Sequence, residues 1–224
     1  PLSITARNRI FYDKKIPYLI FSHGAHDDFG NSSIQDIKNE VIKIRTKPSI
    51  LLIRDPRDVI VSYYFQITKR ISESGLKNNI NKISDIVNND NLGIKRIIDF
   101  INIWYASHIN RDNSFIIFYE NIKKNPEKEF IRLLQFLGEK KINKNSLLKS
   151  VNETSFDKMK KREKENIANS NYLKPGNVND NDSFKSRKGK VNGFYDYFTE
   201  KEIKQLNNYM KNLEFDLKKF YLDN

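Results

Sequence analysis

Short apolar runs that alternate with amphipathic segments constrain the fold of this 224-residue chain more than any other feature. The runs at residues 18–21, 50–53 and 115–118 are rich in β-branched, aromatic and leucine residues and have the length of buried parallel strands. Segments with helical periodicity lie between and after them. This alternation predicts an α/β fold with a central parallel sheet flanked by helices. The length suits one buried core, so we expect a single domain over residues 1–224.

The helical segments are marked by apolar periodicity and by signals at their ends. We predict helices at residues 56–70, 94–108, 126–137 and 200–213. Asn125 and Thr199 are the expected N-caps of the last two, and Gly138 ends the helix that starts at Pro126. His108 lies on the apolar side of its helix, where we expect it to be packed. Residues 169–194 lack periodicity and are predicted to form a long loop.

Composition limits the classes of partner. Forty Lys and Arg residues against 28 Asp and Glu give a formal charge of +12, which favours polyanions such as nucleotides, nucleic acids or acidic surfaces. Much of the excess is Lys interleaved with Glu, a pattern typical of solvated helix faces. The chain has no cysteine, and no apolar run approaches the roughly 20 residues that span a bilayer. We therefore expect a soluble, cytoplasmic protein, and no residue spacing demands a metal.

The clearest functional signal follows the second predicted strand. Arg54 stands at the carboxyl edge of that strand, and Asp55 precedes a helix that begins with proline. Anions bind at this edge of parallel sheets, where the next helix offers free amides. Arg54 can hold a phosphate through two hydrogen bonds, and Ser62 lies about two helical turns further along. In the alternative interpretation, Arg54 only pairs with Asp58 or Asp55 to hold the turn. Arg57 is expected to be exposed.

These residues resemble those of a known family. The stretch RDPRDVIVSYY is similar to the signature by which cytosolic and related sulfotransferases bind the 3′-phosphate of their donor, 3′-phosphoadenosine 5′-phosphosulfate (PAPS). In that family the arginine and the serine of the signature contact the phosphate, which implies the same role for Arg54 and Ser62. The resemblance also implies a P-loop-NTPase-like, three-layer α/β fold.

A second anion-binding motif lies in the predicted loop, in the stretch SRKGKVNGFYDYFTEKE. Backbone amides around a glycine can form an anion nest, although most basic loop tripeptides are merely solvated. Sulfotransferases carry Arg-Lys-Gly, then a glycine, an aromatic residue and Phe-Thr at a helix start. The resemblance implies that Arg187, Lys188 and Gly189 close over the same 3′-phosphate. The chain departs from the family at Phe194 and Tyr195, where Asp-Trp is usual.

Two further stretches match the family in the same order. FIIFYENIKKNPEKEFIRLLQFLG resembles the strand, Tyr-Glu-Asp and helix of sulfotransferases, with Asn121 in place of the aspartate. There the tyrosine lies beside the adenosine, so Tyr119 is its counterpart. ETSFDKMKKRE resembles the segment whose threonine and phenylalanine flank the adenine, which implies these roles for Thr154 and Phe156. Without the resemblance, a phenylalanine at helical spacing is more often a core residue.

Sulfuryl transfer requires a base for the acceptor proton. The predicted strand at residues 18–21 would deliver His23 to the same sheet edge as Arg54, and histidine is suited to proton removal near neutral pH. His23 matches the catalytic histidine of the family, but Phe21 stands where the family has a lysine. His26, Asp27 and Asp28 are alternative bases, and His23 could instead be a structural residue.

The resemblance implies a PAPS-dependent sulfotransferase that uses no metal, releases adenosine 3′,5′-bisphosphate (PAP) and sulfates a hydroxyl or amine acceptor. That acceptor could be a glycan, a lipid or a small alcohol, and the chain could form a homodimer. The family's loop for the 5′-phosphosulfate has no counterpart here. We therefore expect an N-terminally truncated sequence that is inactive as it stands.

Two other functions fit the same composition. A basic nucleic-acid-binding domain would gather cations and exposed aromatic residues on one face, whereas the aromatic residues here mostly have core spacing. A kinase-like phosphotransferase shares the expected architecture and would bind ATP with magnesium. We expect no nucleic-acid partner.

Overall fold

The computed structural model describes residues 19–24, 32–70, 80–167 and 174–223. Its sheet has two parallel strands, β1 (Ser49–Ile53) and β2 (Ser114–Phe118), paired from Ser49 opposite Ser114 to Ile53 opposite Phe118. Both strands were predicted to within one residue. The parallel pairing confirms the α/β class, because the chain between the two strands crosses over through helices.

The third predicted strand, at residues 18–21, is not formed by its described residues. Leu19, Ile20 and Phe21 belong to no strand and are 43%, 60% and 72% exposed, and Tyr18 lies outside the described residues. An apolar run becomes a strand only where a neighbouring strand satisfies its backbone groups. Neither described strand pairs with this segment.

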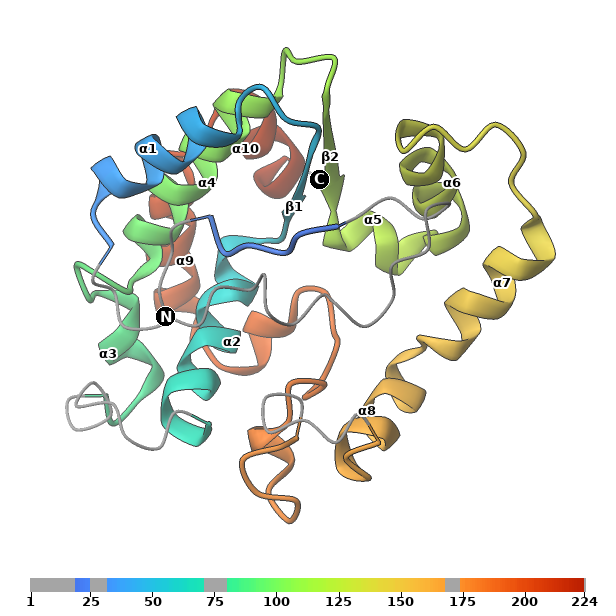
Figure 1. Cartoon of the computed structure of the whole chain (residues 1–224). Helices are drawn as coiled ribbons and strands as arrows, with labels where there is room; N and C mark the ends of the chain where they lie inside the picture. Colours follow the sequence, from blue (N-terminus) through green and yellow to red (C-terminus); the bar gives the residue numbers. More distant parts are fainter. Residues whose placement is uncertain (1–18, 25–31, 71–79, 168–173, 224) are drawn as a thin grey trace.

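The helices lie on both sides of the sheet. They are α1 (Ile34–Ile44), α2 (Pro56–Lys69), α3 (Ile83–Val87), α4 (Ile94–His108), α5 (Tyr119–Lys124), α6 (Pro126–Phe136), α7 (Lys144–Glu153), α8 (Phe156–Lys164), α9 (Glu200–Met210) and α10 (Phe215–Leu222). In Figure 1, α1, α4, α9 and α10 lie on one side of the strands and α5 and α6 on the other. From α6 the chain runs through α7 to α8, which lies beside the loop before α9.

The four predicted helices are formed, although the last ends at Met210 rather than at residue 213, and their ends follow from local chemistry. The Asn125 side chain accepts from the Lys128 amide at 3.0 Å, and Thr199 forms a capping box with Glu202. Gly138 has a φ of +94°, a conformation that glycine adopts without strain. The predicted loop at 169–194 is also confirmed for residues 174–194, which contain only two 3-10 turns, Asn181–Ser183 and Gly193–Asp196.

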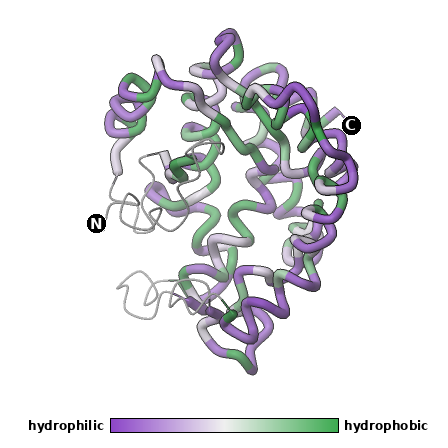
Figure 2. Tube along the Cα trace, turned by 45° about the vertical axis from the view of Figure 1, so that its right-hand side comes forward, coloured by the Kyte–Doolittle hydropathy of each residue, from purple (hydrophilic) through white to green (hydrophobic). Residues whose placement is uncertain are grey.

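The main core lies between the sheet and the helices α2, α4, α9 and α10. Its fully or almost fully buried members include Ile53, Ile60, Ile67, Ile97, Ile98, Leu206, Met210 and Leu217. In Figure 2 hydrophobic residues are concentrated toward the middle of the molecule, and much of its periphery is hydrophilic. This core holds the carboxyl end of β1 and the start of α2 in one fixed position.

Arg57 was predicted to be exposed, and that prediction is wrong, because only 5% of the residue is exposed. Its guanidinium pairs with Asp55 at 2.6 Å and donates to the Asn207 side chain at 2.6 Å and the Tyr221 carbonyl at 3.1 Å. It also lies 4.4 Å from the centre of the Phe194 ring. Arg57 therefore ties the β1–α2 turn to α9 and α10.

His108 is packed, as predicted, with 2% of the residue exposed. Its Nδ1 lies 2.9 Å from the Trp104 carbonyl, and its Nε2 lies 3.0 Å from the Ser49 hydroxyl. Burial lowers the pKa of His108 below its ordinary value of 6.5, because the charged ring would lose its hydration.

We predict that this histidine makes the fold less stable in mild acid. The unfolded chain binds the His108 proton more tightly than the folded one, so stability present above pH 6.5 is lost as pH falls below it. Urea unfolding between about pH 7.5 and 5.5 should show this loss, and His108→Gln should reduce it. His23→Gln, at an exposed position, is the control and should keep it. An unchanged pH slope in His108→Gln would contradict the assignment.

Candidate functional site

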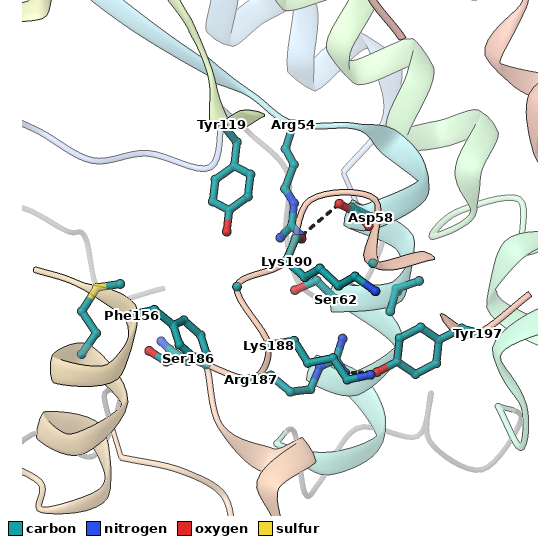
Figure 3. A pocket seen from close by; sticks show the side chains of 15 residues that line it. Arg54, Asp58, Ser62, Tyr119, Phe156, Ser186, Arg187, Lys188, Lys190 and Tyr197 are labelled. Atoms are coloured by element: carbon teal, nitrogen blue, oxygen red, sulfur yellow. Dashed lines mark hydrogen bonds and ion pairs between the residues drawn. The ribbon is translucent and has the colours of Figure 1, made fainter. Parts of the chain in front are cut away.

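A cavity of about 220 Å³ opens at the carboxyl end of β1 (Figure 3). Its walls come from the β1–α2 turn, α2, the start of α5, α8 and the loop that precedes α9. The lining residues are Arg54, Asp58, Val61, Ser62, Tyr119, Phe156, Met159, Lys185, Ser186, Arg187, Lys188, Gly189, Lys190, Gly193 and Tyr197. We call residues 185–190 of this lining the basic loop.

Arg54 forms one wall of the cavity. Its guanidinium lies 3.3 Å from the Asp58 carboxylate, donates to the Lys190 carbonyl at 3.1 Å and lies over the Tyr119 ring, 4.4 Å from its centre. Asp58 is almost fully buried and also accepts from the Phe194 amide at 2.9 Å. The ion pair with Asp58 therefore exists, but it holds Arg54 within the cavity lining rather than away from it.

Asp58 is a buried residue of this wall, and its burial affects the pKa of its carboxyl. Burial raises the pKa of the Asp58 carboxyl, and the adjacent Arg54 cation opposes the rise. The charge of Asp58 is thus stabilised mainly by the guanidinium that a bound anion would also contact.

The basic loop forms the opposite wall, and aromatic rings orient its cations. Arg187 lies over the Phe65 ring, 3.9 Å from its centre, and over the Tyr197 ring at 5.1 Å. It also donates to the Tyr197 hydroxyl. Lys188 lies 4.5 Å from the centre of the Tyr197 ring and 3.4 Å from the Asp196 carboxylate. Cation–π contacts of this kind fix the direction of side chains that would otherwise be mobile.

Gly189 brings the basic loop against α8. Its φ is +58°, and a Cβ built on it would lie 2.4 Å from the Phe156 ring. Only glycine permits both this backbone conformation and this close contact. Phe156 is half-buried and lines the cavity, so it forms part of the wall rather than the main core.

Most of the predicted nucleotide-binding residues line this one cavity: Arg54, Ser62, Tyr119, Phe156, Arg187, Lys188 and Gly189. Thr154 does not, because it ends α7 and its hydroxyl donates to the Ser150 carbonyl at 2.9 Å.

The predicted base, His23, is exposed and is not part of this lining. Its neighbour Gly24 is fixed, since the Gly24 carbonyl accepts from the Trp104 indole at 3.3 Å. His26 lies outside the described residues.

Several lining residues were not predicted, including Lys190, Tyr197 and Met159. Lys190 follows Gly189 directly, so the predicted anion nest already pointed to it. Tyr197 could have been found because it lies two residues before the N-cap Thr199 and therefore near the loop.

The described residues contain no group of three or more His, Cys, Asp and Glu side chains that could hold a metal ion. Within the same residues, no helix is both long and apolar enough to cross a membrane.

Comparison with known proteins gives consistent matches. Residues 32–221 match the family described as the sulfotransferase domain. The chain is 30% identical over 155 residues to Sulfotransferase 1E1 of Bos taurus, which covers 67% of this chain and 49% of the relative. It is 33% identical over 101 residues to Sulfotransferase 1C2 of Homo sapiens, covering 45% and 32% of the two chains. The chain thus spans about half or less of these relatives.

Solved structures show the same fold. Mouse sulfotransferase SULT7A1 complexed with PAP superimposes with a TM-score of 0.61 at 23% identity, covering 84% of this chain and 63% of that one. Retinol dehydratase in complex with androsterone and inactive cofactor PAP gives a TM-score of 0.57 at 23% identity, with coverages of 74% and 47%. This agreement bears out the predicted P-loop-NTPase-like architecture. The family match covers residues 32–221, which is most of this chain, and the chain therefore belongs to the sulfotransferase domain family.

Proposed function

We propose that this chain binds PAPS and its product PAP, and that it forms the donor-binding part of an enzyme that sulfates a hydroxyl or amine acceptor. The observation that carries the proposal is the meeting of Arg54 with Arg187 and Lys188 in one cavity. PAP is the ligand named for both solved structures compared above, which supports the choice of nucleotide.

The cavity suits a doubly charged phosphate. Arg54 offers a planar fork from the end of β1, and Arg187 and Lys188 line the same cavity from the basic loop, beside Tyr197 (Figure 3). An arginine can bind two phosphate oxygens at once, while a lysine adds a point charge. The Ser62 hydroxyl, on α2, adds a neutral donor to the same cavity. This arrangement favours a nucleotide that carries a 3′-phosphate, such as PAPS, over one whose ribose has a free 3′-hydroxyl.

Aromatic side chains suit the adenosine. Tyr119 and Phe156 contribute rings to the cavity from α5 and α8. Flat aromatic rings stack on purines and bury them without a hydrogen-bond requirement. The resemblance of both segments to those of sulfotransferases supports this role.

The reaction would follow the logic of phosphoryl transfer. The acceptor oxygen or nitrogen attacks sulfur in line, the bond from sulfur to the 5′-phosphate oxygen breaks, and PAP leaves. The acceptor proton passes to a base, for which we propose His23, with His26 as the alternative. Trp104 holds the loop of His23 through Gly24, which limits the positions that His23 can take.

The structure favours this reading over a nucleic-acid interface. Three cations of α8 are paired with acids: Lys158 and Arg162 with Glu153 of α7, and Lys161 with Glu165, the C-cap of α8. A surface whose cations are neutralised in this way attracts a polyanion weakly.

We predict that the wild-type chain binds PAP more tightly than adenosine 5′-monophosphate. Arg54→Ala should weaken PAP binding by at least about 10-fold, since it removes a charged hydrogen-bond donor. Isothermal titration calorimetry measures both affinities. His23→Ala is the control and should keep the PAP affinity. Equal affinities of the wild-type chain for the two nucleotides would refute the site.

A second prediction concerns Gly189. Gly189→Ala should weaken PAP binding by about 10-fold, because its Cβ would push the Phe156 ring or displace the basic loop. Gly138→Ala is a matched control: its φ is also positive, but a Cβ there meets no atom within 4 Å. If both variants bind PAP like the wild type, the close contact between loop and ring has no part in binding.

A further inference from the structure

Glu163 is a buried acid on a helix otherwise rich in exposed charge. It lies on α8, seven residues after Phe156, so the two side chains share a helix face about two turns apart. Only 7% of Glu163 is exposed. Its carboxylate accepts from the backbone amide of Lys185 at 2.6 Å and from that of Ser186 at 2.8 Å. Two successive amides of the basic loop thus form an anion nest that a protein side chain fills.

The same carboxylate also contacts α2. Arg70, the C-cap of α2, lies 3.3 Å from the Glu163 carboxylate and donates to the Ser183 carbonyl at 3.1 Å. Both side chains are almost fully buried, at 10% and 5% exposed. One buried ion pair therefore joins three segments that line the cavity, namely α2, α8 and the basic loop.

We infer that Glu163 is a positioning residue for the donor site, because it fixes the basic loop and its Arg187 relative to α8 and α2. This inference rests on the proposed function and deepens it. The adenosine side of the cavity includes Phe156, on the same helix as Glu163, and the phosphate side includes Arg187, directly after the two amides that Glu163 binds. Glu163 therefore sets the spacing between the two halves of the nucleotide site.

A carboxylate is required for this role. A glutamine has one acceptor oxygen and no charge, so it cannot hold both loop amides and also neutralise Arg70. Replacing Glu163 removes the carboxylate that balances the charge of the buried Arg70 and takes an acceptor from the partly buried loop amides. The loop should then move away from α8, and the phosphate contacts should weaken more than the adenosine contacts.

The test is a calorimetric comparison of PAP and adenosine 5′-monophosphate with the whole chain. Glu163→Gln should bind PAP about 10-fold more weakly and the monophosphate less than about 2-fold more weakly. Glu165→Gln, at the exposed C-cap of the same helix, is the matched control and should bind both as the wild type does. Circular dichroism and thermal unfolding check that each variant is folded.

A double-mutant cycle separates positioning from general stability. If Glu163 acts through the basic loop, Glu163→Gln should weaken PAP binding by less than about 2-fold in a chain that already carries Arg187→Ala. Arg70→Lys provides a second variant if Glu163→Gln does not fold. It should also weaken the binding of PAP more than that of adenosine 5′-monophosphate. The inference is overturned if the tested variant binds PAP like the wild type, or loses both nucleotides equally. A wild-type chain without preference for PAP would instead overturn the proposed function.

Discussion

The buried ion pair between Arg57 and Asp55 is the interaction on which the site depends. Its 2.6 Å contact closes the turn between β1 and α2, and Arg57 continues to Asn207 and the Tyr221 carbonyl. Removing one partner of such a pair costs about 3–5 kcal/mol, because it leaves a buried charge uncompensated. Because Asp55 is paired with Arg57, Asp55 does not draw Arg54 into the turn, and Arg54 lines the cavity. Two arginines three residues apart thus serve the fold and the site separately.

The cations of the cavity are oriented before any ligand binds. Arg54 pairs with Asp58, Arg187 with Asp182, and Lys188 with Asp196. Pairs that reach solvent contribute little to stability, so a phosphate can replace Asp182 or Asp196 at small cost. Asp58 differs because it is buried and also accepts from the Phe194 amide, so the fold itself holds it beside Arg54. Binding would then exchange ion pairs rather than order mobile side chains, which lowers its entropic cost.

Local sequence signals predicted β1, α2 and α9, but not α5 and α8, which also contribute walls to the cavity. The run before Arg54 gave β1, proline and Asp55 marked the start of α2, and Thr199 with Glu202 marked α9, because strand patterns and helix caps depend on neighbours in the sequence. The helix α1 was missed although Ser33 and Asp36 carry a capping box.

Long-range contacts explain what sequence reasoning missed. The burial of Arg57 depends on Asn207 and Tyr221, which no local pattern links to it. Glu163 lies among interleaved Lys and Glu residues, a pattern typical of a solvated helix face, and the loop amides that bind it carry no side-chain signature. The predicted strand at residues 18–21 is apolar, but its four residues do not determine which neighbouring strand it would pair with.

The most direct measurement is a crystal structure of the chain with PAP. We predict density for the 3′-phosphate between the Arg54 guanidinium and the basic loop, within hydrogen-bond distance of Arg54 and either Arg187 or Lys188. The nucleotide's rings should lie against Tyr119 or Phe156. Density for PAP at any other surface, with this cavity unoccupied, would contradict the proposed donor site.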